Sequence, residues 1–248
     1  MEHYEMVLNN RSHFMGKHKR KSARFALNES HFNIVDIHPM TANQTRVFED
    51  FEDGKHLFLH GVAGTGKTYI SLYLAARELF DLGPRYKNLS IVRSIVPTRD
   101  IGFLPGSEEQ KMEVYEAPYK SIFSDLFCRG DAYQLLKKKG AINFMTTSFI
   151  RGVTLNDTII LVDECQNMNF HELDSIITRM GQNCRIIFCG DFRQSDFTKT
   201  NDKDGILKFI EIMKNMPDVG FTEFVEHDIV RSCFVKSYIL NKLQAGIV

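Results

Sequence analysis

The chain has 248 residues, of which 43% are hydrophobic and 25% charged, enough for one large globular domain or two small ones. Its 31 basic and 31 acidic side chains cancel, which excludes a polycation, so any binding to nucleic acid must use a local basic patch. The sequence has no apolar run of eighteen residues, no secretory signal and no metal-type spacing of its cysteines. We therefore expect a cytoplasmic protein without a membrane contact or a zinc site.

The first 26 residues are polar and irregular, and their basic side chains cluster between Lys17 and Arg24. We expect residues 1–26 to form a flexible basic arm, which is either a solvated tail or a contact for nucleic acid. Residues 27–248 are expected to form one domain.

Strand and helix signals alternate through this domain. A capped helix is predicted from Thr41 to Asp53, and five short apolar runs follow, separated by stretches of helical period. The predicted strands are His56–His60, Ser90–Arg93, Ile142–Thr146, Thr158–Val162 and Arg185–Cys189, and the helical stretches are Thr68–Leu82, Glu109–Phe127 and His171–Met180. This order predicts an α/β fold with a parallel sheet of five or more strands and helices on both faces. Residues 97–140 are expected to be a helical insertion within the domain.

A phosphate-binding loop follows the first predicted strand. The pattern GxxxxGK[ST] lies between that strand and an apolar helix, which is the context that the motif requires. Its backbone N–H groups and the start of the helix favour phosphate oxygens, while Lys67 reaches the β and γ phosphates and Thr68 offers its hydroxyl to Mg²⁺. The predicted ATP contacts are Gly61, Val62, Ala63, Gly64, Thr65, Gly66, Lys67, Thr68 and Tyr69.

Two acidic residues follow the predicted strand Thr158–Val162. An acidic side chain at the end of a buried strand is costly unless a cation lies beside it, so Asp163 is predicted to bind Mg²⁺. Glu164 is placed to polarise the attacking water as general base, which favours hydrolysis over transfer to a substrate hydroxyl.

A third group of polar residues, Gly190 to Gln194, ends the next strand. Gln194 would lie near the γ-phosphate and position water there. At least one strand separates the phosphate-loop strand from the acidic strand, and this separation together with Asp163 and Glu164 points to a RecA-like P-loop NTPase.

With these residues together, the chain resembles the PhoH-like ATPases, a family related to superfamily 1 helicases. The likeness covers residues 41–237. It includes Gln44, in the place where helicase-like proteins use a glutamine to read adenine. The other matching motifs are Gly102-Phe-Leu-Pro-Gly106, Phe149-Ile-Arg151-Gly152, Asp163-Glu-Cys-Gln-Asn167, Gly190-Asp-Phe-Arg-Gln194 and Asp228-Ile-Val-Arg231-Ser.

The resemblance implies ATP hydrolysis and a role as an RNA or single-strand helicase. Residues Arg93–Asp100 depart from the family pattern, so nothing is carried over for that loop. No nuclease-like PIN domain precedes the ATPase core in this sequence, so no role in RNA cutting is carried over either.

Catalysis of this kind uses an arginine that meets the charge of the transition state. Superfamily 1 helicases keep it on a second RecA-like domain, for which this chain has no room. We therefore expect a neighbouring subunit to supply it within a homo-oligomer, a hexameric ring being one such form. Arg231 is the main candidate, and Arg151 and Arg179 are weaker ones.

Three functions remain open. The first is a motor stimulated by single-stranded RNA or DNA, contacted by basic residues and by aromatic residues such as Phe103 or Tyr115. The second is a regulatory ATPase that acts on protein partners. The third is a small-molecule kinase, against which Glu164 argues.

Overall fold

The computed structural model describes residues 32–80, 84–94, 108–150, 152–192 and 200–246, and the chain from Asn33 onward forms one compact unit. The predicted basic arm, residues 1–26, lies outside the described residues. Within the described part of the chain, none of the helices combines the length and apolar character needed to cross a membrane.

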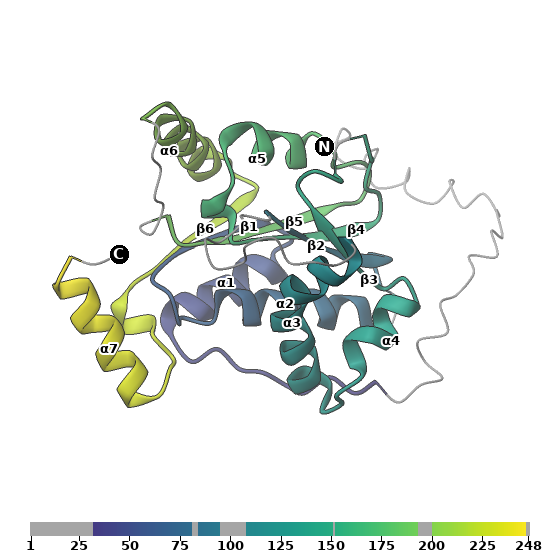
Figure 1. Cartoon of the computed structure of the whole chain (residues 1–248), viewed down its shortest axis with the longest axis horizontal. Helices are drawn as coiled ribbons and strands as arrows, with labels where there is room; N and C mark the ends of the chain where they lie inside the picture. The colour runs from purple at the N-terminus through teal and green to yellow at the C-terminus, as the bar shows by residue number, and fades with distance from the viewer. Residues whose placement is uncertain (1–31, 81–83, 95–107, 151, 193–199, 247–248) are drawn as a thin grey trace, which may run out of the picture. The chain divides into compact units, whose positions relative to one another are not determined.

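The unit is built on a parallel sheet of six strands (Figure 1). The strands are β1 (His56–Gly61), β2 (Asn88–Arg93), β3 (Ile142–Thr146), β4 (Thr158–Asp163), β5 (Arg185–Gly190) and β6 (Val219–Phe224), in the order β3-β2-β4-β5-β1-β6. Strand β5 lies between the phosphate-loop strand β1 and the acidic strand β4, as the RecA-like arrangement requires. The predicted α/β fold is therefore confirmed.

The sixth strand was not predicted. Its sequence, VGFTEF, mixes glycine, threonine and glutamate with apolar residues, and the strand lies at one edge of the sheet. It pairs with the whole length of β1, from His56 opposite Val219 to Gly61 opposite Phe224.

Helices cover both faces of the sheet, as predicted (Figure 1). One face carries α1 (Ala42–Glu52), α2 (Lys67–Phe80), α3 (Glu108–Phe127) and α4 (Ala132–Lys138), and the other carries α5 (Phe170–Ile177) and α6 (Thr200–Asn215). Helix α7 (Cys233–Gln244) lies at the β6 end of the sheet, on the side of α1 to α4. Short 3₁₀ turns, η2 (Cys165–Asn167) and η4 (Glu226–Asp228), follow β4 and β6. Helices α6 and α7 were not predicted.

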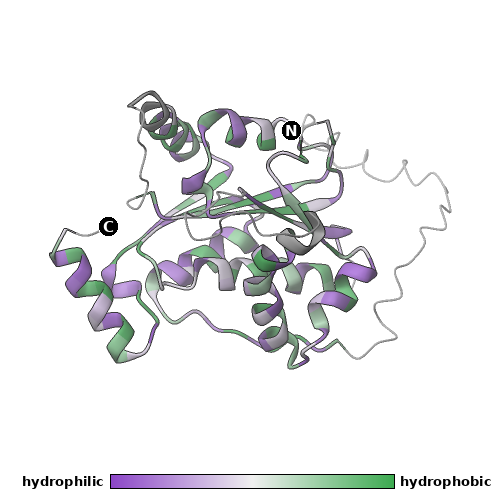
Figure 2. Cartoon of the chain, in the orientation of Figure 1, coloured by the Kyte–Doolittle hydropathy of each residue, from purple (hydrophilic) through white to green (hydrophobic). Residues whose placement is uncertain are grey.

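The core consists of two apolar layers on either side of the sheet. Alternate strand residues face opposite layers, so Phe58 and Phe188 pack with α5 and α6, whereas Leu57 and Leu59 face the α1 and α2 side. Figure 2 shows hydrophobic residues along the central strands and mixed hydropathy along the helices that cover them. Because both faces of the central strands are covered, β4 and β5 read as nearly continuous apolar runs.

Helix α1 begins at the predicted cap. The side chain of Thr41 accepts a hydrogen bond from the backbone N–H of Gln44, which satisfies one of the free donors of the first turn. Val47 and Phe51 are buried, and Phe48 is half-buried. This cap also fixes where Gln44 enters the functional site.

Candidate functional site

A cavity of about 880 Å³ opens at the edge of the sheet where the parallel strands end. It is bounded by the segment before α1, the loop between β1 and α2, one side of α3, the ends of β4 and β5, and the segment after η4. A volume of this size is typical of sites for cofactors and other small molecules.

The loop between β1 and α2 has the backbone of a phosphate-binding loop. Gly61, Gly64 and Gly66 all have positive φ, which only glycine adopts without strain. At Gly61 a side chain would also overlap the carbonyl oxygen of Phe224 on β6. The loop shape therefore depends on glycine and on the neighbouring strand.

Lys67 holds this loop together at its mouth. Its ammonium donates to the carbonyl oxygens of Gly61 and Val62, each at 2.8 Å. Burial lowers the pKa of Lys67, while nearby acidic groups, of which Asp191 has the largest effect, oppose this decrease. The ammonium therefore lies at a position where phosphate oxygens would replace the two carbonyl oxygens as its hydrogen-bond partners.

Gln44 is buried against the loop. Its Nε2 donates to the carbonyl of Thr65 at 2.9 Å, and its Oε1 accepts from the N–H of Met40 at 2.8 Å. A glutamine amide has two N–H groups and two acceptor positions. Beyond these two contacts, Gln44 therefore has one N–H and one acceptor position for a further partner. The two backbone contacts fix which way round the amide lies.

Thr68 and Asp163 meet at the expected magnesium position. Thr68 Oγ1 donates to Asp163 Oδ1 at 2.9 Å, and Tyr119 Oη on α3 donates to Oδ2 at 2.9 Å. Burial, and after it the charge of Glu164, raises the pKa of Asp163. A buried carboxylate beside a hydroxyl is the oxygen donor set that Mg²⁺ prefers, so these residues fit the ion.

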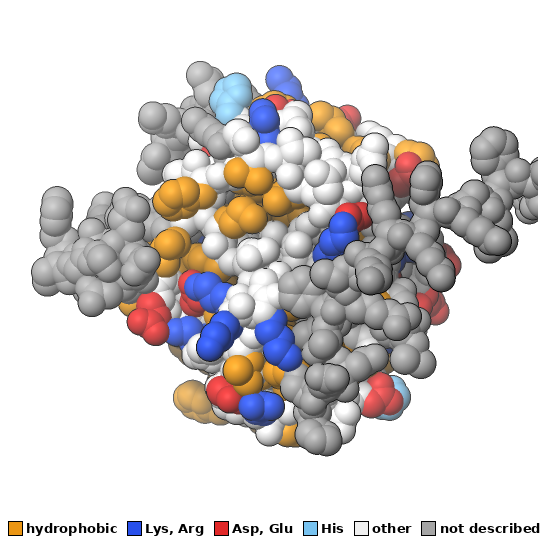
Figure 3. Space-filling view, turned by 90° about the vertical axis from the view of Figure 1, so that its right-hand side faces the viewer, with side chains coloured by type: hydrophobic (Ala, Val, Ile, Leu, Met, Phe, Trp, Pro, Cys, Tyr) orange, Lys and Arg blue, Asp and Glu red, His pale blue; other side chains and the backbone are white. Residues whose placement is uncertain are grey.

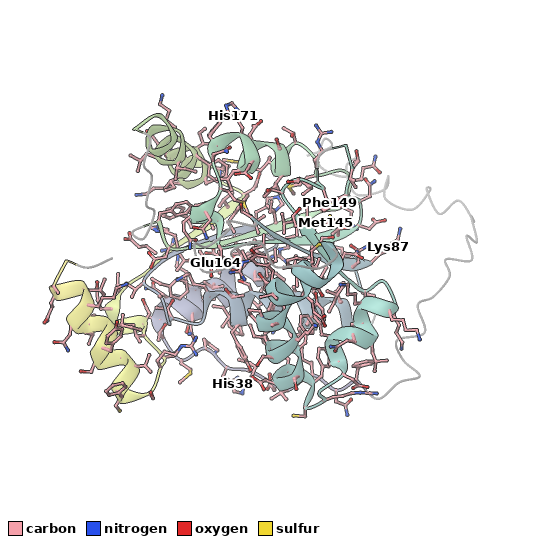
Figure 4. All side chains as sticks on the ribbon, viewed as in Figure 1. His38, Lys87, Met145, Phe149, Glu164 and His171 are labelled. Atoms are coloured by element: carbon pink, nitrogen blue, oxygen red, sulfur yellow. The ribbon has the colours of Figure 1, made fainter. Side chains whose placement is uncertain are left out.

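Glu164 follows Asp163 in a left-handed backbone conformation, with φ of 52°. Such a conformation is strained for a residue other than glycine, and strain of this kind collects at functional sites. Gln166 donates to Glu164 Oε2 at 2.6 Å and accepts from the N–H of Asp191 at 3.1 Å. Gln166 therefore links the acidic residue at the end of β4 (Glu164 is labelled in Figure 4) to the end of β5.

Most predicted site residues of the described chain line this cavity. They are Gln44, Ala63, Gly64, Thr65, Gly66, Lys67, Thr68, Tyr69, Asp163, Glu164 and Arg231. Gly61 and Val62 lie beneath it and contact Lys67. Gln194 and Arg151 lie outside the described residues. Arg179 is at the opposite end of β4, where its carbonyl accepts from the N–H of Leu155.

Arg231 lies in the cavity of its own chain, whereas the sequence predicted that a neighbouring subunit would supply the arginine. The segment that returns from β6 brings it there: the N–H of Val230 donates to Gly64 O at 3.1 Å, and the stem of Arg231 packs on Gly64. The sequence alone does not reveal this return, because β6 was not predicted.

Two residues of the site were missed as functional candidates. Gln166 was recognised only as part of a motif, and Tyr119 was not considered. The signal for Tyr119 was its spacing of four from Tyr115, which places both on one side of a helix. Nothing in the sequence indicates that this side faces Asp163.

Comparisons with a family model and with known proteins point to the same family. A family model described as "PhoH-like protein" matches residues 36–241. The chain is 32% identical over 210 residues to "Protein PhoH2" of Bacillus subtilis, covering 82% of this chain and 47% of that protein. It is 28% identical over 202 residues to "Protein PhoH" of Escherichia coli, covering 79% and 56%. The chain spans about half the length of these relatives.

Two solved structures are similar at low identity. One is a Sulfolobus solfataricus SWI2/SNF2 ATPase core in complex with dsDNA, with 13% identity and a TM-score of 0.42 over 73% of this chain and 37% of that one. The other is the large terminase of a thermophilic bacteriophage, with 10% identity and a TM-score of 0.46 over 81% and 50%.

Proposed function

The chain belongs to the family of PhoH-like proteins, and from that premise we propose that it binds ATP with Mg²⁺ and hydrolyses the nucleotide. The observation that carries the proposal is the contact between Thr68 and Asp163, with Glu164 next to it, at the mouth of a glycine-rich loop that begins a helix. Phosphate, metal and water sites are thus adjacent.

The residues divide the work as follows. Thr68 and Asp163 would hold Mg²⁺, which supplies positive charge against the phosphate oxygens. The backbone N–H groups of the loop bind phosphate oxygens, and Lys67 exchanges its carbonyl partners for the β and γ phosphates. Arg231 neutralises charge that develops on the transferred group, and Gln194 positions water.

Glu164 acts as the general base. Its carboxylate accepts from Gln166, which keeps it at the cavity rather than in solvent. A base must lie within hydrogen-bond reach of the water that it activates, so the orientation set by Gln166 supports this role.

Gln44 is suited to adenine. Adenine presents an acceptor at N7 and a donor at N6, and a glutamine amide matches this pair. The donor and acceptor that Gln44 has left after its contacts with Thr65 and Met40 form that pair. Guanine presents two acceptors there and does not match.

Two variants test the proposal. We expect Lys67→Ala to lose ATP binding, and Glu164→Gln to keep binding while turnover falls about 100-fold or more, as for loss of a general base. Glu211→Gln, at an exposed position of α6, is the control and should behave as the unchanged protein. Normal turnover in Glu164→Gln would contradict the assigned base, and binding retained in Lys67→Ala would contradict the phosphate site.

We further propose that single-stranded RNA or DNA stimulates this ATPase. The side of the molecule at the β3 edge supports this, because hydrophobic side chains gather on its upper half and Lys and Arg side chains on its lower half (Figure 3). Just after β3, the ring of Phe149 is 54% exposed, which suits stacking on a base. Tyr115, in contrast, lies against Arg93 with the guanidinium 5.9 Å from its ring centroid.

Turnover measured with and without single-stranded RNA and DNA at low salt tests this part, since phosphate contacts weaken as salt rises. Stimulation that disappears in Lys67→Ala and Glu164→Gln supports a nucleic-acid-stimulated motor. Turnover that is indifferent to polynucleotide favours the alternative, a regulatory ATPase that acts on protein partners.

Assembly into a homo-oligomer is the last part of the proposal. Helix α7 follows Arg231 directly and buries none of its residues, with Phe234 81% and Tyr238 64% exposed. Exposed aromatic side chains on one helix are typical of a surface that another protein covers. A head-to-tail contact of this kind between identical chains closes into a ring when its rotation allows.

A further inference from the structure

Tyr119, on helix α3, hydrogen-bonds through its phenol hydroxyl to the carboxylate of Asp163. Tyr119 Oη donates to one carboxylate oxygen at 2.9 Å, and Thr68 Oγ1 donates to the other at 2.9 Å. Tyr119 has an exposed fraction of 0%, so water does not compete for this contact. The two donors fix the plane of the carboxylate from both ends.

The hydroxyl of Tyr119 has a second partner. Arg93, the last residue of β2, is opposite Asp163 in the sheet register and hydrogen-bonds to the phenol. A guanidinium only donates, so it takes an acceptor position of the hydroxyl and leaves the phenol proton for Asp163. The ring packs near Phe144, with centroids 5.9 Å apart. The charge of Arg93, its hydrogen bond to the phenol and the packing against Phe144 therefore hold Tyr119 in one orientation.

We infer that Tyr119 is a positioning residue for the proposed magnesium carboxylate: it holds Asp163 so that one carboxylate oxygen lies beside Thr68, and these two residues would bind Mg²⁺. The inference rests on the proposed ATP and Mg²⁺ site. The same helix lines the cavity with Pro118, Ser121 and Ile122. One helix thus shapes the nucleotide wall and orients the carboxylate, and a displacement of α3 changes both.

The test is Tyr119→Phe, which removes one oxygen and keeps the ring. Mn²⁺ binding is followed by electron paramagnetic resonance in the presence of adenylyl imidodiphosphate, a non-hydrolysable ATP analogue. Binding of the same analogue in EDTA is measured separately. Tyr133→Phe is the control, because Tyr133 on α4 is an equally buried phenol that packs against Phe123. The titration gives affinity and number of sites separately, so partly unfolded protein lowers the number of sites and leaves the affinity readable.

We expect Tyr119→Phe to weaken Mn²⁺ binding about 10- to 100-fold, the usual effect of removing an outer hydrogen bond to a metal ligand, with metal-free nucleotide affinity unchanged. Tyr133→Phe should leave both affinities unchanged. The inference is overturned if Tyr119→Phe binds Mn²⁺ as tightly as the unchanged protein, even when its melting temperature falls, because Tyr119 is then structural only. If the unchanged protein binds neither analogue nor Mn²⁺, the proposed function itself has failed.

Discussion

At the scale of the residue, the site is ordered because single polar side chains each hold two partners. Gln44, Asp163 and Gln166 all show this arrangement, and each joins two different elements of the fold. Donors and acceptors fixed in this way need little reorganisation when nucleotide binds, which is the condition under which electrostatic stabilisation is most effective.

Gln44→Glu tests the adenine contact. The variant keeps the size of the side chain but replaces the N–H donor to Thr65 by a carboxylate oxygen, and it also loses the donor for adenine N7. We expect ATP affinity to fall about tenfold or more and the preference for ATP over GTP to be lost, because a buried acceptor is left unpaired. Competition binding with ATP and GTP measures both. Unchanged discrimination would exclude Gln44 as the residue that reads the base.

The phosphate loop and the acidic pair are predictable from sequence because their chemistry depends on residue types at fixed spacing within a few residues. Tyr119 is not predictable in this way. Its role depends on how α3 lies against the end of β4, a contact between residues 44 positions apart. Arg231 was recognised as a candidate, but which cavity it enters depends on β6, which was not predicted.

At the scale of the element, the phosphate loop depends on a strand that comes late in the chain. Gly61 ends β1 directly opposite Phe224 of β6, and no side chain fits between them. The edge strand therefore packs against the start of the loop. The mixed composition of β6 gave no clear strand signal, whereas the other five strands were predicted to within two residues at each end.

The variant Gly61→Ala tests how far stability depends on the close approach of Gly61 to β6. We expect a loss of about 3 kcal/mol or more in unfolding free energy, since the change combines overpacking against backbone with a strained positive φ. Gly54→Ala is the matched control, because Gly54 also has positive φ but no atom near the position of a new side chain. It should cost only about 1 kcal/mol. Equal losses in chemical denaturation would show that the β6 contact contributes nothing.

His56, at the start of β1, makes stability depend on pH. Its Nδ1 accepts from the N–H of Ile186, and burial, with Arg185 as the next cause, lowers its pKa below the usual 6.5. The neutral form is favoured in the fold, so this stabilisation is present above pH 6.5 and is lost as pH falls through the lowered pKa. Melting temperatures between pH 7.5 and 5 should fall less in His56→Asn than in the unchanged protein. Parallel decreases in both would contradict this role.

At the scale of the whole molecule, α7 is the element least explained by the single chain. It has no buried residue, and its aromatic side chains face solvent next to the segment that delivers Arg231 to the cavity. Its sequence lacks the regular apolar period of the helices that cover the sheet, which is why it was not predicted.

The double variant Phe234→Ser, Tyr238→Ser tests whether another copy covers α7. We expect the unchanged protein to form an oligomer in native mass spectrometry and the variant to shift toward the monomer, because an interface loses its aromatic anchors. Leu207→Ser on α6, where an apolar side chain is also 55% exposed, is the control and should not change the assembly. A variant that assembles normally would place the interface elsewhere.

The position of β1 in the sheet has a consequence for synthesis on the ribosome. This strand is made early, yet its two neighbours, β5 and β6, are residues Arg185–Gly190 and Val219–Phe224. Until those segments emerge, the strand that carries the phosphate loop has neither edge paired, and its face toward α5 and α6 is uncovered. A nascent chain therefore stays unable to hold nucleotide through most of translation and presents a surface that chaperones recognise.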